Sequence, residues 1–334
     1  MRDLPTLTRE SRPYTQENLR KSWGLLLGTF AVWIVATLGT LSGPIWSRTL
    51  FSILSGMVIV RLFIFYHDYL HGSLFKGSKA VRPILDTLGV LILNPPHVWK
   101  RSHNYHHQHN AMMATASIGS YPVLTVKQYE QASVRERLLY RAARHPVTIL
   151  FGYFFIFLLG MCLKSFLTDP KRHFDSLIAI VVHVALLTGI TYFFGFEITF
   201  FAFLFPLFLA CAAGAYLFYI QHNAPGIQLR PRAEWNYTFA ALRSSTFMEG
   251  SWFTHWWTGN IGYHHVHHLN SNIPFYNLPE AMNAIPELQA PIRTSLKPAD
   301  IYRCLRLKLW DPDRQELVGF REAGFGLIPA YHGR

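Results

Sequence analysis

Four apolar runs of bilayer length constrain the fold of this 334-residue chain more than any other feature. They cover residues 23–41, 49–66, 177–196 and 198–220, and each is close to the roughly 20 apolar residues that a helix needs to cross the hydrocarbon core. Hydrophobic residues make up 50% of the chain and charged residues only 15%, which is too apolar for an ordinary soluble domain. We therefore predict an all-α integral membrane protein with four transmembrane helices.

A fifth apolar run, residues 147–163, is shorter, and basic residues flank it on both sides. Because basic residues favour the cytosolic side of a membrane, a crossing here would force one basic cluster to the outside. We interpret this run as an interfacial or re-entrant helix. The polar stretches 67–146 and 221–334, broken by Pro and Gly, are expected to form a helical cap on the cytosolic side of a single domain covering residues 1–334.

The distribution of charge predicts how the chain lies in the membrane and what it binds. The segment before the first run carries five Lys and Arg residues, and the loop after that run carries one, Arg48. This asymmetry predicts that both termini and the cap lie on the cytosolic side. The net charge is +12, but the basic residues are scattered between hydrophobic segments, so we expect membrane lipids as partners and no nucleic acid.

Eight of the 17 histidines form three clusters at helical spacing, each beyond an apolar run, and a ninth, His222, stands alone just after the last run. Residues three or four apart on a helix share one face, and imidazole is a ligand suited to iron, zinc, copper and nickel. Nine ligands exceed what one ion accepts in ordinary geometry, so we predict two metal ions that share them. The candidate ligands are His67, His71, His103, His106, His107, His222, His264, His267 and His268.

Residues next to these candidates bear on the chemistry of the site. Neutral imidazoles leave the charge of two metals uncompensated, which favours anionic oxygen ligands between them and points to redox chemistry. Asp68, inside the first cluster, is a candidate acceptor for the ring N–H of a ligating histidine. Eight other histidines lie off the helical spacing or far from the clusters, and we expect them not to bind the metals: His97, His109, His145, His173, His183, His255, His265 and His332.

Three stretches, "HDYLHGS", "HNYHH" and "TGNIGYHHVHHLN", resemble the three histidine boxes of the integral-membrane fatty acid desaturase family. With flanking stretches such as "YIQHN" and "SNIPFYNLPEA", the likeness is to acyl-lipid desaturases of the omega-6 (delta-12) type, and it covers residues 61–311. The resemblance implies a cytosolic non-haem di-iron centre, held by the nine histidines. Such a centre uses O2 and two electrons to introduce a double bond into a lipid-linked fatty acyl chain.

The sequence departs from the family pattern at several positions. In related desaturases an asparagine four residues before the lone histidine completes one coordination sphere through water, whereas this chain has Phe218 there. Asn260, four residues before His264, is a candidate substitute. Tyr69 and Leu70 stand where the branch more often has a small pair, which bears on the position of the double bond. The chain has no HPGG haem motif, so we expect an external electron donor, a ferredoxin or a small b-type cytochrome.

Two alternatives remain beside the desaturase reading. A hydroxylase or ketolase acting on a lipid or carotenoid is one, since the same histidine boxes serve oxygen insertion as well as dehydrogenation. A metal transporter or metal-binding membrane protein is the other. Transporters hold their site near the bilayer midplane on broken helices, whereas these histidines lie at predicted helix ends, and only His183 is predicted to lie deep in the membrane.

Overall fold

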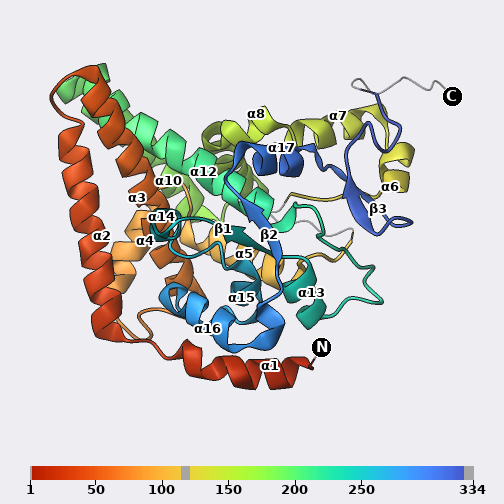
Figure 1. The fold of residues 1–334 in the computed structure, drawn as a ribbon. Coiled ribbons are helices and arrows are strands. Elements are labelled where there is room, and N and C mark those ends of the chain that lie inside the picture. The colour runs from red at the N-terminus through yellow and green to blue at the C-terminus, as the bar shows by residue number, and fades with distance from the viewer. Residues whose placement is uncertain (1, 114–120, 327–334) are drawn as a thin grey trace.

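The computed structural model describes residues 2–113 and 121–326, and these form a mostly helical protein (Figure 1). Within these ranges four helical stretches are long and apolar enough to cross a membrane, which confirms the predicted fold class. They are α2 (Leu19–Gly39), α3 (Ile45–His71), α10 (Phe174–Phe194) and the stretch Phe196–His222, which combines α11 (Phe196–Thr199), the π-helix η3 (Phe200–Leu204) and α12 (Phe205–His222).

The remaining helices are short, and four short strands that were not predicted lie among them. Before the third span they are α1 (Leu4–Ser11), η1 (Arg12–Thr15), α4 (Val81–Leu91), α5 (Pro96–His109), α6 (Val126–Gln131), α7 (Val134–Ala143), α8 (Pro146–Leu150), η2 (Tyr153–Lys164) and α9 (Ser165–Thr168). After the fourth span they are α13 (Tyr237–Arg243), β1 (Thr246–Glu249), α14 (Trp252–Trp257), α15 (His264–Leu269), η4 (Phe275–Asn277), α16 (Leu278–Ala284), η5 (Pro286–Leu288), β2 (Ile292–Ser295), α17 (Pro298–Arg306), β3 (Leu309–Asp311) and β4 (Glu316–Val318).

The spanning helices form two hairpins whose turns lie at the same end of the bundle. The second hairpin turns at Gly195, which has a φ of +85°, a conformation that glycine adopts without the strain of a side chain. Arg48, at the start of α3, forms an ion pair with Glu197, at the start of α11. This ion pair joins the two turns at one end of the bundle. The C-termini of α3 and α12 therefore lie together at the opposite end, where they carry His71 and His222.

Close packing of α3 against α12 keeps these histidine-bearing ends in register. The Ser52 hydroxyl of α3 donates a hydrogen bond to the Phe201 carbonyl at 2.6 Å. Further along α3, a Cβ added at Gly56 would lie 2.9 Å from the carbonyl oxygen of Pro206 and 3.1 Å from the Cβ of Leu209. The absence of a side chain at Gly56 therefore allows the two helix backbones to approach each other.

The fifth apolar run forms a shorter helical segment rather than a fifth long span. Its apolar helix covers Tyr153–Thr168, shorter than the four spanning stretches, and most of it is the π-helix η2. A hydrogen bond joins the Tyr153 hydroxyl to Nε2 of His183 on α10, which gives this deep histidine a partner on a neighbouring helix. The interfacial or re-entrant position of this segment stays a prediction.

The short elements after α12 fold back around the end of the bundle that carries the histidines. Strand β1 pairs in parallel with β2, from Thr246 opposite Ile292 to Glu249 opposite Ser295, and β3 pairs antiparallel with β4. Helix α1 lies along the lower edge of the molecule below α16 in Figure 1. These segments surround α15, which carries the last group of histidines.

The close approach at Gly56 leads to a first prediction. Gly56→Leu is expected to overpack the contact between α3 and α12, which costs about 1–3 kcal/mol, and to lower both the melting temperature in detergent and the amount of bound metal. Gly189→Leu is the matched control, because a Cβ at Gly189 on α10 meets nothing within 4 Å. Equal melting temperatures for the two variants would contradict the packing argument.

Candidate metal centre

The first pair of histidines lies on the last turns of α3, where the helix end is firmly fixed. Gly72 ends the helix with a φ of +74°, the left-handed conformation common at helix C-termini. The backbone N–H and the hydroxyl of Ser73 both donate to the Asp68 carbonyl at 3.0 Å. His67 and His71 therefore project from a capped helix end, one turn apart on the same face.

The second histidine cluster lies on α5, which begins at the second of two consecutive prolines. Pro96 occupies the first helical position, where a missing N–H costs nothing. Just before it, the Asn94 carbonyl accepts a hydrogen bond of 2.6 Å from the Tyr66 hydroxyl of α3. This contact fixes the start of α5 beside the first pair of histidines. Three imidazoles on α5 are buried: His103, His106 and His107.

The third cluster lies on the six-residue helix α15, and the surrounding backbone holds it against α12. The Met248 N–H donates to the Gly262 carbonyl at 2.8 Å, which ties β1 to the approach of α15. The Gln221 amide donates to the Ile261 carbonyl at 3.2 Å. Because Gln221 precedes His222, this bond brings the end of α12 beside the start of α15.

The structure brings all nine candidate imidazoles together in two groups. In each group, one nitrogen of every ring lies within 4.8 Å of one nitrogen of every other ring. The first group of histidines comes from α3, α5 and α15, and the second from α5, α12 and α15. The members of the first group are His67, His71, His103, His107 and His267, and those of the second are His106, His222, His264 and His268.

In the second group, four Nε2 atoms form a closed ring. The sides measure 3.0 Å from His106 to His222, 2.9 Å from His222 to His264, 3.1 Å from His264 to His268 and 3.3 Å from His268 to His106. A square of such sides has its centre about 2.2 Å from each corner, close to the roughly 2.1 Å of a metal–imidazole bond. The spacing fits one ion at the centre of the ring.

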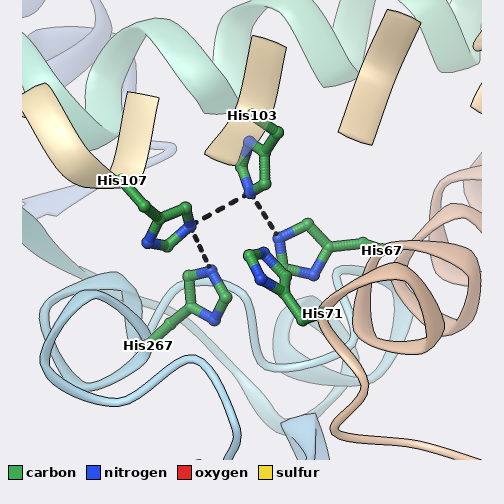
Figure 2. A group of neighbouring side chains, drawn as sticks. All are labelled: His67, His71, His103, His107 and His267. Atoms are coloured by element: carbon green, nitrogen blue, oxygen red, sulfur yellow. Dashed lines mark hydrogen bonds between the residues drawn. The ribbon is translucent and has the colours of Figure 1, made fainter. Parts of the chain in front are cut away.

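Four members of the first group form an open chain of Nε2 atoms, which Figure 2 shows with dashed lines. Nε2 of His103 lies 3.1 Å from Nε2 of both His67 and His107, and Nε2 of His107 lies 3.0 Å from that of His267. The fifth member, His71, has a buried Nε2 with no hydrogen-bond partner among the described residues. A buried polar atom without a partner is costly, and a metal ion within the group would satisfy it.

In His67 and His222, a hydrogen bond from Nδ1 determines that Nε2 is the nitrogen free to bind a metal. His67 donates from Nδ1 to the Asp68 carboxylate at 2.9 Å, and His222 donates from Nδ1 to the Ser244 carbonyl at 2.9 Å. Since a neutral imidazole carries one N–H, Nε2 of both rings presents a lone pair to its group. Lone pairs directed at a common centre are what metal ligation requires.

Burial keeps the imidazoles neutral, as metal ligands must be. Desolvation, together with the neighbouring imidazoles, lowers the pKa of the six histidines on α5 and α15 well below its usual value. These six are His103, His106, His107, His264, His267 and His268.

Asp68 is hydrogen-bonded to one of the nine histidines, whereas the side chain of Asn260 is not. Asp68 accepts from Nδ1 of His67 through one carboxylate oxygen and from the Phe275 N–H at 2.7 Å through the other, so it orients a candidate ligand. The side chain of Asn260 donates to the Phe275 carbonyl at 3.1 Å, and no hydrogen bond joins it to the nine imidazoles among the residues described. Phe218 packs against His106, with ring centroids 4.9 Å apart.

The remaining histidines of the described chain belong to neither group, and several have other partners. His265, between members of the third cluster, donates from Nε2 to the Leu288 carbonyl at 3.0 Å. His97 lies beside the Asp175 carboxylate, and His173 bonds to the Ser165 carbonyl. His332 lies outside the described residues.

A largely apolar cavity lies beside both groups of histidines. Its walls come from α3, α5, η2 and α12, and His103 of the first group and His106 of the second both line it. Its empty volume is about 800 Å³, including its opening. We call it the apolar cavity; its lining residues on α12 include Leu207, Ala210, Cys211 and Gly214. Sequence reasoning missed this cavity, because its walls come from segments that are distant along the chain.

The fold and the site together define a membrane protein with two adjoining histidine groups, each able to hold a metal, beside an apolar cavity. A family profile described as fatty acid desaturase matches residues 43–296 of this chain. The chain belongs to the fatty acid desaturase family, which confirms the resemblance seen in the histidine boxes.

Relatives in several organisms agree with this assignment. A fatty acid desaturase of Bacillus subtilis (strain 168) is 32% identical over 328 residues, covering 94% of this chain and 90% of the relative. An sn-1 oleoyl-lipid 12-desaturase of Synechocystis sp. is 25% identical and covers 83% of this chain and 79% of the relative. An sn-1 acyl-lipid omega-3 desaturase (ferredoxin) of Nostoc sp. (strain 36) is 24% identical, with coverages of 71% and 66%.

The contacts of Asp68 lead to the second prediction. Asp68→Asn cannot accept from both His67 and Phe275, since one side of an amide is a donor. We expect metal affinity to fall about 10- to 100-fold, measured by titrating the purified protein with a chelator and quantifying retained metal. Asp86→Asn is the control, because Asp86 pairs only with Arg82 in the ion pairs of the described residues. Unchanged affinity in Asp68→Asn would refute an orienting role.

Proposed function

We propose that this protein is a di-iron acyl-lipid desaturase. In this reaction two adjacent methylenes of a lipid-linked acyl chain lose two hydrogens and become a double bond. With two electrons from a donor and two protons, O2 is reduced to two waters. Family membership supports a desaturase, and the observation that carries the metal assignment is the convergence of nine imidazoles in two groups.

The nine histidines are the proposed ligands, and their chemistry supports iron. Two irons would supply the redox chemistry that activates O2, whereas zinc, which suits the same imidazoles, has no redox chemistry. Asp68 is proposed to hold the ring of His67 in its binding orientation. No role is assigned to Asn260, whose side chain bonds to a backbone carbonyl instead.

The acyl chain is proposed to occupy the apolar cavity. An apolar chain matches an apolar wall, and His103 and His106 line that wall, so a chain inside it runs past both histidine groups. The name of the sn-1 oleoyl-lipid 12-desaturase supports a lipid-linked chain as the substrate. Such a chain would displace water from the cavity, and the cavity wall would hold the reacting methylenes in a fixed position.

The orientation in the membrane and the electron donor are part of the same proposal. Five Lys and Arg residues precede α2, against Arg48 in the following loop, which supports placing the termini, the cap and the metal centre on the cytosolic side. Two relatives are named as ferredoxin desaturases. An external ferredoxin or small b-type cytochrome docking on that side would deliver the electrons.

The third prediction tests the reaction itself. Expression in a host that lacks desaturases of this kind is expected to create new double bonds in the acyl chains of membrane lipids, measured by mass spectrometry of the lipid extract. Hydroxylated or keto products, or altered carotenoids alone, would instead support the hydroxylase or ketolase alternative. Metal flux into liposomes without lipid oxidation would support a transporter.

The fourth prediction tests the ligand assignment. His107→Ala is expected to abolish desaturation and to lower the iron bound per chain, because His107 Nε2 lies about 3 Å from two other group members. His265→Ala is the matched control, since its ring bonds to the Leu288 carbonyl; it should keep its iron and much of its activity. Equal iron loss in both folded variants would undo the assignment of His107.

A further inference from the structure

A second cavity adjoins the apolar cavity beside the metal centre. The two share three lining residues, His106, Tyr121 and Phe218. The second cavity has an empty volume of about 660 Å³, including its opening, and several polar side chains line it, among them Tyr105, Asn110, Arg144 and Asn223. We call it the polar cavity. An apolar and a polar cavity thus lie side by side at the edge of the second histidine group.

Arg144, which lines the polar cavity, is a buried cation whose partners are all neutral. The Arg144 side chain has no exposed surface. Its guanidinium donates to the Pro122 carbonyl at 2.9 Å and to the side-chain oxygen of Asn223, and its Nε has no hydrogen-bond partner among the described residues. Burying a charge without a counter-charge is costly.

Lys308 adds a second buried cation beside Arg144. Its ammonium donates to the Arg144 carbonyl and, at 3.3 Å, to the Tyr219 hydroxyl. Burial, together with the charge of Arg144, lowers the pKa of Lys308 to about 7. Neither cation has an acidic partner within 4.0 Å in the part of the chain that the structure describes, and residues 114–120 contain no Asp or Glu.

A ligand with an apolar chain and an anionic end would match both compartments at once. The apolar cavity offers few polar atoms, whereas Arg144, a fully buried guanidinium with no acidic partner and with an Nε that has no hydrogen-bond partner among the described residues, borders the polar cavity. Guanidinium groups bind phosphate and carboxylate oxygens well. The Tyr121 carbonyl accepts from Arg144 at 3.4 Å, so the cation also contacts a residue at the junction of the cavities.

We propose that the polar cavity binds the anionic end, a phosphate or a carboxylate, of the lipid whose acyl chain occupies the apolar cavity. This inference rests on the proposed function. The chain passes between Tyr121 and Phe218 beside His106, so contact with the anionic end fixes how far the chain extends past the metal centre. Arg144 at the polar cavity, together with the charge of the adjacent Lys308, then selects substrates by charge as well as by chain.

The wild-type protein tests the proposal without any risk of misfolding. Turnover is compared in mixed micelles of a neutral detergent with phosphatidylglycerol, monogalactosyl diacylglycerol or the free fatty acid, all carrying the same acyl chain. We expect the half-saturating mole fraction to be about tenfold lower for an anionic lipid than for the galactolipid. A preference for phosphatidylglycerol identifies a phosphate, and a preference for the free acid identifies a carboxylate. Equal values for all three overturn the proposal.

Variants that remove a positive charge test whether Arg144 and Lys308 cause the preference for anionic lipid. Arg144→Gln and Lys308→Gln are expected to reduce the ratio between anionic and neutral lipid several-fold toward one. Arg172→Gln should keep the wild-type ratio, because Arg172 is exposed and pairs with Asp169. Lys308→Gln keeps Arg144 and its many hydrogen bonds, so it tests the charge even where Arg144→Gln lowers the yield of folded protein. Wild-type ratios in a folded Lys308→Gln variant and a folded Arg144→Gln variant contradict the assignment.

A binding measurement separates this proposal from the proposed function. Dioctanoyl phosphatidylglycerol should raise the melting temperature of the full-length protein, with and without chelator, more than dioctanoyl galactosyl glycerol does. Equal stabilisation by the two lipids overturns the anionic subsite. If no lipid is desaturated but the stabilisation differs as expected, the proposed function fails while the subsite stands.

Discussion

The interaction on which the rest of the structure depends is the convergence of nine mutually facing imidazoles, seven of them buried and two, His71 and His222, half-buried. Nε2 atoms lie 2.9–3.3 Å apart around two centres, and the rings of His67 and His222 present lone pairs to them. Without cations these lone pairs would face one another in a desolvated interior, which is costly. Two metal ions would turn that cost into a stabilising contact between α3, α5, α12 and α15, so metal binding and folding of this end of the protein are expected to be coupled.

Much of the architecture follows from signals that are local in the sequence. The four spans could be predicted because length and apolarity alone identify a bilayer-crossing helix, and the histidine clusters because their spacing repeats the helical period. The grouping of the histidines could not be predicted. His106 and His107 are neighbours yet belong to different groups, since adjacent residues point about 100° apart around a helix. The cavities and the contacts of Arg144 were also out of reach, because they join segments distant along the chain.

The split of each cluster follows one rule on both short helices. On α5 the pair His103 and His107, four residues apart, belongs to the first group, and His106 belongs to the second. On α15 the corresponding pair, His264 and His268, belongs to the second group, and His267 belongs to the first. Each helix therefore gives two ligand candidates to one centre and one to the other. A displacement of either helix would disturb both centres at once, so the two are mechanically coupled.

The apolar cavity lies beside both of these coupled groups of histidines. The cavity wall includes one imidazole from each group, His103 and His106, both on α5. Phe218 of α12 packs against the same two rings, with centroid distances of 6.3 Å and 4.9 Å. A bulky aromatic side chain where relatives are expected to carry a polar residue therefore presents an apolar surface to the cavity beside both centres. In this chain α5 carries ligand candidates of both groups, and in the proposed function Phe218 would limit how closely an acyl chain approaches them.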